Sequence, residues 1–148
     1  MIKDTQTSKR PVIETTEKTI QIGELSLKVP INAEWFEDPD YEDSYYINLE
    51  PEREFGPLVG IDFSAEELLY PEGDEYQYQS DYLKFEGWDY ISYDEEYDLT
   101  DRVIDLKITD QYDSYGNMIY LYFVCSEDEY EEWQDEFEKI LDSVRITE

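Results

Sequence analysis

The segment Asn117-Met-Ile-Tyr-Leu-Tyr-Phe-Val-Cys-Ser126 runs directly into an acidic segment that extends from Glu127 to Thr147. Successive side chains of a strand point to opposite faces of its sheet. In this segment one face would be formed by Ile119, Leu121, Phe123 and Cys125, and the other by Tyr120, Tyr122 and Val124. Because both faces are covered or aromatic, the pattern predicts a strand that is central in its sheet.

The acidic segment has the spacing of an amphipathic helix. Its apolar residues recur three or four positions apart and form one stripe: Tyr130, Trp133, Phe137, Ile140, Leu141 and Val144. Ser126 and Glu129 have the spacing of a capping box, which predicts a helix over residues 127–143 that is capped by Ser126. We expect the stripe to pack on the sheet and the opposite face to carry Glu131, Glu132, Asp135, Glu136 and Glu138.

The residues before the central strand predict a mainly antiparallel sheet. Period-two alternation predicts a hairpin over residues 19–29, and further strands over 45–49, 58–63, 88–93 and 102–109. A loop over residues 110–117, with Gly116 as its permissive residue, leads into the central strand. These patterns predict an α+β fold with about six strands.

Two further helical segments are predicted between the strands. Ser64 and Glu67 have capping-box spacing, which predicts a short helical turn that ends before Pro71. A second helix is predicted from Asp74 to Glu86, followed by Gly87 in a left-handed C-terminal position. Its apolar face would consist of Tyr78, Tyr82 and Phe85.

The length of 148 residues suits one domain. Residues 1–18 are polar and include Pro11, which is typical of a flexible tether, so residues 19–148 are expected to form the folded domain. The chain has no apolar run of about 18 residues, and no membrane insertion is predicted. The first residues also lack the apolar core of a signal peptide. Read literally, this indicates the cytoplasm, whereas a removed leader would place the domain outside it.

The charge balance restricts the partners. Forty acidic residues face eleven basic ones, for a formal net charge of −29. Nucleic acids and anionic lipids are bound through lysine and arginine side chains, so this composition disfavours both. A basic protein partner fits the charge, and a surface that serves solubility alone is the alternative.

The residue types exclude several reactions. The chain contains no histidine, which removes histidine-dependent nucleophiles and imidazole metal sites. The single cysteine, Cys125, lies at an inward position of the central strand and is expected to be a buried structural thiol. The six glycines are scattered and form no phosphate-binding loop, so no cofactor is predicted. A carboxylate-dependent enzyme remains the least favoured alternative, because forty acids give no specific pair.

Calcium is the metal that such acids would suit, because it prefers carboxylate oxygens. One acidic cluster contains Asp38, Asp40, Glu42 and Asp43, and a second contains Asp94, Glu95, Glu96, Asp98 and Asp101. Neither cluster has the spacing of an EF-hand loop, so the sequence predicts no specific metal site and leaves the first cluster as a weak calcium candidate.

The fifteen tyrosines exceed what the core can hold, so some must lie on the surface beside acids. Exposed tyrosine supplies contact area at a low entropy cost, which suits a binding surface, although the rings could equally cover an open sheet face. The contact surface that we predict lies beside the first acidic loop and consists of Trp35, Phe36, Tyr41, Tyr45 and Tyr46.

Four segments together resemble the PsbP-like family, which includes small cell-surface lipoprotein domains of Gram-positive bacteria. The stretch from Lys18 to Pro30 with Trp35 resembles its opening hairpin, and Tyr45-Tyr-Ile47 resembles its aromatic third strand. Tyr120-Leu-Tyr-Phe-Val124 resembles its late strand, and Phe137-Glu-Lys-Ile-Leu-Asp-Ser-Val-Arg-Ile146 resembles its closing helix and final strand. The resemblance covers about residues 18–147.

This resemblance implies an α/β/α sandwich around an antiparallel sheet, with binding or assembly roles and no conserved catalytic set. We therefore expect a non-catalytic binding module that is held at the bacterial cell surface by its tether. The alternative is a cytoplasmic acidic inhibitor or immunity-type protein that mimics nucleic acid and blocks a basic site on a partner.

Overall fold

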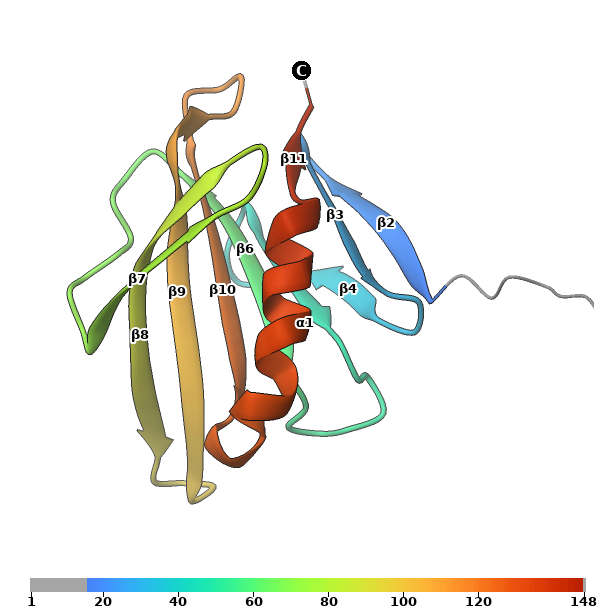
Figure 1. Cartoon of the computed structure of the whole chain (residues 1–148), viewed down its shortest axis with the longest axis vertical. Helices are drawn as coiled ribbons and strands as arrows, with labels where there is room; N and C mark the ends of the chain where they lie inside the picture. The colour runs from blue at the N-terminus through green and yellow to red at the C-terminus, as the bar shows by residue number, and fades with distance from the viewer. Residues whose placement is uncertain (1–15, 148) are drawn as a thin grey trace, which may run out of the picture.

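The computed structural model describes residues 16–147 and contains a seven-stranded sheet, a three-stranded sheet and one long α-helix (Figure 1). The predicted tether falls largely outside these residues. The elements in chain order are β2 (Glu17–Ile22), β3 (Leu25–Pro30), β4 (Glu34–Glu37), β5 (Ser44–Asn48), β6 (Leu58–Ser64), β7 (Asp74–Gln79), β8 (Lys84–Asp94), β9 (Leu99–Tyr112), β10 (Met118–Ser126), the 3₁₀ helix η1 (Glu127–Glu129), α1 (Tyr130–Ser143) and β11 (Arg145–Ile146).

The large sheet has the strand order β4-β5-β6-β10-β9-β8-β7, and all its pairs are antiparallel. The strand predicted to be central, β10, is the fourth of the seven. Ile119, Leu121 and Phe123 are fully buried on the face toward α1. The prediction of a central strand is therefore confirmed.

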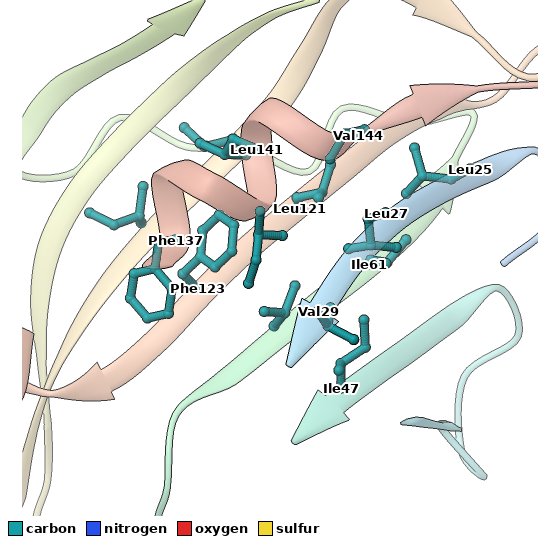
Figure 2. Close-up of a cluster of buried hydrophobic side chains, with 14 of the residues drawn as sticks. Leu25, Leu27, Val29, Ile47, Ile61, Leu121, Phe123, Phe137, Leu141 and Val144 are labelled. Carbon is teal, nitrogen blue, oxygen red and sulfur yellow. The ribbon is translucent and has the colours of Figure 1, made fainter. Parts of the chain in front are cut away.

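Helix α1 and the small sheet β11-β3-β2 both lie against one face of the large sheet, which we call the helix face (Figure 1). Phe137 of α1 stacks on Phe123 of β10, with their ring centroids 4.6 Å apart. Leu25, Leu27 and Val29 of β3 fill the space beside them, as Figure 2 shows. The predicted apolar stripe of the helix is thus the part that completes the core.

The α+β class and the antiparallel sheet are confirmed, but the number of strands is larger than predicted, and the expected α/β/α sandwich is not formed, because α1 is the one α-helix in residues 16–147 and covers a single face of the large sheet. Within residues 16–147, ten strands in two sheets replace the expected six. Residues 74–86, predicted as a helix, form β7, a turn and the start of β8, with Tyr78 opposite Phe85. The short helical turn after Ser64 is also wrong, because residues 65–73 contain no helix.

The predicted helix at 74–86 fails because its segment also has strand periodicity. Tyr76 and Tyr78 alternate with polar residues, and Ser80 closes a tight turn by accepting hydrogen bonds from the amides of Tyr82 and Leu83. Gly87 does not end a helix. It lies within β8, where an added Cβ would fall 1.8 Å from the carbonyl oxygen of Asp105.

The C-terminal helix begins later than predicted. Residues Glu127–Glu129 form the 3₁₀ helix η1, and α1 starts at Tyr130. The Ser126 side chain makes no capping hydrogen bond, so the predicted capping box is not formed. In the described part of the chain, no helix is long and apolar enough to cross a membrane.

Candidate functional site

The face of the large sheet opposite α1 carries one row of side chains that crosses all seven strands. The strand register aligns Phe36, Tyr46, Gly60, Tyr122, Asp105, Trp88 and Glu75 in this order. We call this face the open face. Tyr46, Tyr122 and Trp88 are half-buried there, whereas Phe36 at the edge is 45% exposed.

The aromatic side chains at one end of this row contact one another. The ring centroids of Phe36 and Tyr46 are 5.5 Å apart, and those of Tyr46 and Tyr122 are 6.5 Å apart. The Tyr46 hydroxyl group donates a hydrogen bond of 2.6 Å to Asp38. This bond raises the pKa of Tyr46 and lowers the pKa of Asp38, so the phenol stays neutral and the carboxylate stays charged.

Two carboxylates flank β10 on the open face. Asp62 of β6 lies opposite Tyr120, and Asp105 of β9 lies opposite Tyr122. Burial raises the pKa of Asp105 to about 6, with a smaller contribution from the charge of Asp62. Burial also raises the pKa of Asp62, although this carboxylate accepts a hydrogen bond from the Ser44 hydroxyl group.

These two carboxylates lack the cation that a half-buried acid usually has. Within residues 16–147, neither Asp62 nor Asp105 forms an ion pair. On the helix face, by contrast, Asp89 is paired in a bidentate manner with Arg102. The charged form of an unpaired, desolvated carboxylate is stabilised when a cation approaches.

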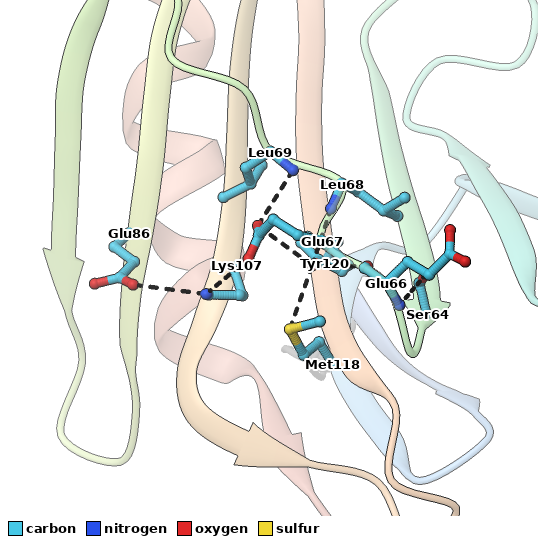
Figure 3. Close-up of polar contacts among 9 residues, drawn as sticks. All are labelled: Ser64, Glu66, Glu67, Leu68, Leu69, Glu86, Lys107, Met118 and Tyr120. Carbon is cyan, nitrogen blue, oxygen red and sulfur yellow. Dashed lines mark hydrogen bonds and ion pairs between the residues drawn. The ribbon is translucent and has the colours of Figure 1, made fainter.

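Segment 65–73 crosses one end of the open face and is held there by Tyr120 and Lys107 (Figure 3). The Tyr120 hydroxyl group accepts a hydrogen bond of 3.1 Å from the Leu68 amide and donates one of 3.2 Å to the Glu66 carbonyl oxygen. The Lys107 ammonium group lies 3.4 Å from Glu67. This segment therefore covers the neighbouring row at Tyr120 and Lys107, and its Leu69 and Pro71 line a pocket together with Trp88.

The structure separates the five side chains that were predicted to form the contact surface. Phe36 and Tyr46 lie on the open face, whereas Trp35 and Tyr45 lie on the helix face, with ring centroids 6.1 Å apart. Tyr41 is 69% exposed in the loop between β4 and β5. The five side chains therefore do not share one face of the sheet, and the two open-face residues join the candidate site; their role in binding stays a prediction.

The acidic loops show no arrangement for a metal ion. Asp38 accepts hydrogen bonds from Tyr46 and from the Asp40 amide, which occupies both of its oxygens. Across the described residues, no group of three or more acidic or cysteine side chains is placed to hold a metal. The weak calcium candidates Asp38, Asp40, Glu42 and Asp43 gain no support from their geometry.

The Cys125 thiol lies on the helix face of β10 and is 2% exposed. Burial raises its pKa to about 12, with smaller contributions from Glu129, Asp101 and Glu127. A thiol in this environment holds its proton and is a poor nucleophile. The prediction that Cys125 is a buried core residue is confirmed.

The sequence did not identify Asp62, Trp88 and Asp105 as site residues. The alternation over residues 102–109 and 118–125 sets Asp105 and Tyr122 on the faces away from Ile104 and Leu121, so part of the signal was present. What was missing is the strand order, because β6 joins this row through a pairing with β10, which is distant in the sequence.

Comparison of the sequence with protein-family models and with curated proteins found no match. The resemblance to PsbP-like domains therefore stays a prediction.

Proposed function

We propose that the protein is a non-catalytic binding module that holds a basic protein partner on the open face of its large sheet. The observation that carries this proposal is the pair of half-buried carboxylates Asp62 and Asp105, which are set among aromatic rings and form no ion pair within residues 16–147. Tyrosine and tryptophan are enriched in protein interfaces, where they bury a large area for few rotatable bonds.

The charge of the chain supports a basic partner. A net charge of −29 attracts cationic surfaces over long distances and speeds their encounter. A lysine or arginine side chain on the open face would meet the faces of Tyr122 and Trp88 as well as the two carboxylates. Cations bind favourably to such ring faces, most strongly when both groups are desolvated.

The resemblance to PsbP-like domains supports a binding role and, with the polar tether, a place outside the cell. This localisation is part of the proposal, and protease treatment of intact producing cells tests it. Digestion of the protein under these conditions is the expected result. Full protection until the cells are lysed would favour the cytoplasm.

A second candidate function uses a different surface. The outer side of α1 presents Glu131, Glu132 and Asp135 to solvent along a helix of 14 residues. Regularly spaced carboxylates of this kind can occupy a basic groove that otherwise binds nucleic acid. This surface supports the alternative of a cytoplasmic acidic inhibitor.

A pair of charge-matched variants separates the two functions. Asp62→Asn with Asp105→Asn removes two charges from the open face, and Glu131→Gln with Asp135→Asn removes two from the helix. Each variant and the wild type are used to capture partners from native lysate at low salt. We expect a basic protein that the helix variant retains and the open-face variant loses.

The opposite pattern, with loss on the helix variant alone, would support the acidic inhibitor. Equal retention by both variants would contradict both surfaces. Repeating the capture at high salt tests the charge contribution, because screening weakens attraction between exposed charges.

A further inference from the structure

A second concave surface lies on the helix side of the molecule. It is a groove of about 730 Å³ between the start of α1, segment 49–53 and the connection from β3 to β4. Its apolar wall contains Trp133, Leu49, Pro30 and Pro51. We call it the Trp133 groove. It lies across the sheet from the open face, so it is a separate surface.

The walls of this groove are held in place by contacts within the protein. Arg53 forms a bidentate pair with Glu129, with nitrogen–oxygen distances of 2.8 and 2.7 Å, and a further contact of 2.6 Å with Glu50. These bonds tie segment 49–53 to the start of the helix. Trp133 in turn stacks on the buried Phe137, with ring centroids 6.2 Å apart. The groove is thus preformed, which lowers the entropy cost of binding.

The groove is negatively charged. The two acids paired with Arg53 neutralise its guanidinium group. Glu34 and Glu52 also line the groove and are exposed, and neither forms an ion pair within the described residues. An anionic ligand is therefore disfavoured. A second copy of this chain, with its own charge of −29, is disfavoured for the same reason.

We propose that the Trp133 groove binds an extended, proline-containing segment of a partner protein that carries an arginine or lysine beside its prolines. Proline-rich segments adopt the polyproline II conformation before binding and dock in grooves lined by aromatic side chains. The proline rings would pack against Trp133 and Pro51. The adjacent cation would lie near Glu34 and Glu52.

Two-dimensional NMR of the full chain tests this proposal, because the indole N–H groups of Trp35, Trp88 and Trp133 give separate signals. The probe is a synthetic peptide of alternating proline and arginine. One control peptide has glycine in place of proline, and another has glutamine in place of arginine. Trp35→Phe and Trp88→Phe variants assign the signals.

We expect the Trp133 signal to shift and to saturate, and the affinity to fall about tenfold for either control peptide. Glu34→Gln with Glu52→Gln should weaken binding of the arginine peptide by a similar factor. The charge-matched Glu131→Gln with Glu132→Gln should change it by about twofold or less, because those acids lie on the outer side of α1.

Three results would overturn the proposal. The first is a shift of the Trp88 signal without a shift of the Trp133 signal, which would place the peptide on the open face. The second is equal binding of the glycine peptide, which would indicate charge attraction alone. The third is an equal loss of affinity for the arginine peptide in Glu34→Gln with Glu52→Gln and in Glu131→Gln with Glu132→Gln.

Discussion

The ring of Tyr122 lies directly over Gly60 on the neighbouring strand. A Cβ atom at Gly60 would fall 1.9 Å from Cζ of Tyr122, which is far inside van der Waals contact. The two residues are register partners of β10 and β6. The absent side chain of Gly60 is therefore what lets the tyrosine lie flat along the open face, beside Tyr46.

Gly60→Ala should displace this ring and destabilise the fold. We expect a loss of about 1–3 kcal/mol in the free energy of unfolding, the usual cost of overpacking a well-packed site. Urea denaturation measures it. In a Tyr122→Ala background the same substitution should cost much less, because the clash is gone. An equal cost in both backgrounds would contradict the contact.

Tyr120→Phe should loosen the segment that covers one end of the open face. The hydroxyl group bonds both the Leu68 amide and the Glu66 carbonyl oxygen, and losing these bonds should cost about 1 kcal/mol. Hydrogen exchange of the Leu68 amide should become faster. Tyr115→Phe is the control, since that side chain is 86% exposed and its loss should leave the exchange rate unchanged.

The parts of the fold that the sequence predicted are those set by local periodicity. The alternation around Leu121 and the stripe through Phe137 each specify a buried face, and the structure buries both. Segment 74–86 was mispredicted because Tyr78 and Phe85 fit a helix spacing and a hairpin register equally well. The pairing of β8 with β9 favours the hairpin over the helix. It joins residues that are separated in the sequence, such as Phe85 and Ile108.

The candidate site was less predictable for the same reason. Tyr46 could be proposed from its neighbours in sequence, but its partner Tyr122 comes from a strand near the other end of the chain. Likewise, nothing in the sequence around Asp105 indicates that Trp88 and Tyr122 lie on either side of it. The register of three strands makes that arrangement.

Cys125 should react slowly with thiol reagents in the native protein. It is buried, and its raised pKa leaves little thiolate at neutral pH. Labelling should therefore be limited by opening of the structure and become fast in denaturant. Cys125→Ala should cost about 1 kcal/mol or somewhat more through lost packing, without affecting partner capture. Native labelling at the rate of a free thiol would contradict the buried assignment.

Asp105 should make the protein less stable as the pH rises from about 4 to about 6. Its pKa is about 6 in the folded chain and near 3.8 when unfolded, so the folded state binds more protons between these values. The contribution of Asp105 to the free energy of unfolding therefore falls as the pH rises through this window and levels off once the pH is above the folded-state pKa. The group is partly exposed, so we expect about 1 kcal/mol after screening.

Asp105→Asn removes this titration and supplies the test. Urea unfolding at several pH values should give nearly equal stability for the two proteins near pH 4 and a more stable variant near pH 7. Asp135→Asn is the matched control, because it removes one charge from the exposed side of α1 and should follow the wild-type profile. Parallel profiles for wild type and Asp105→Asn would mean that the Asp105 carboxyl group is solvated, and the proposed attraction for a partner's cation would lose its main physical cause.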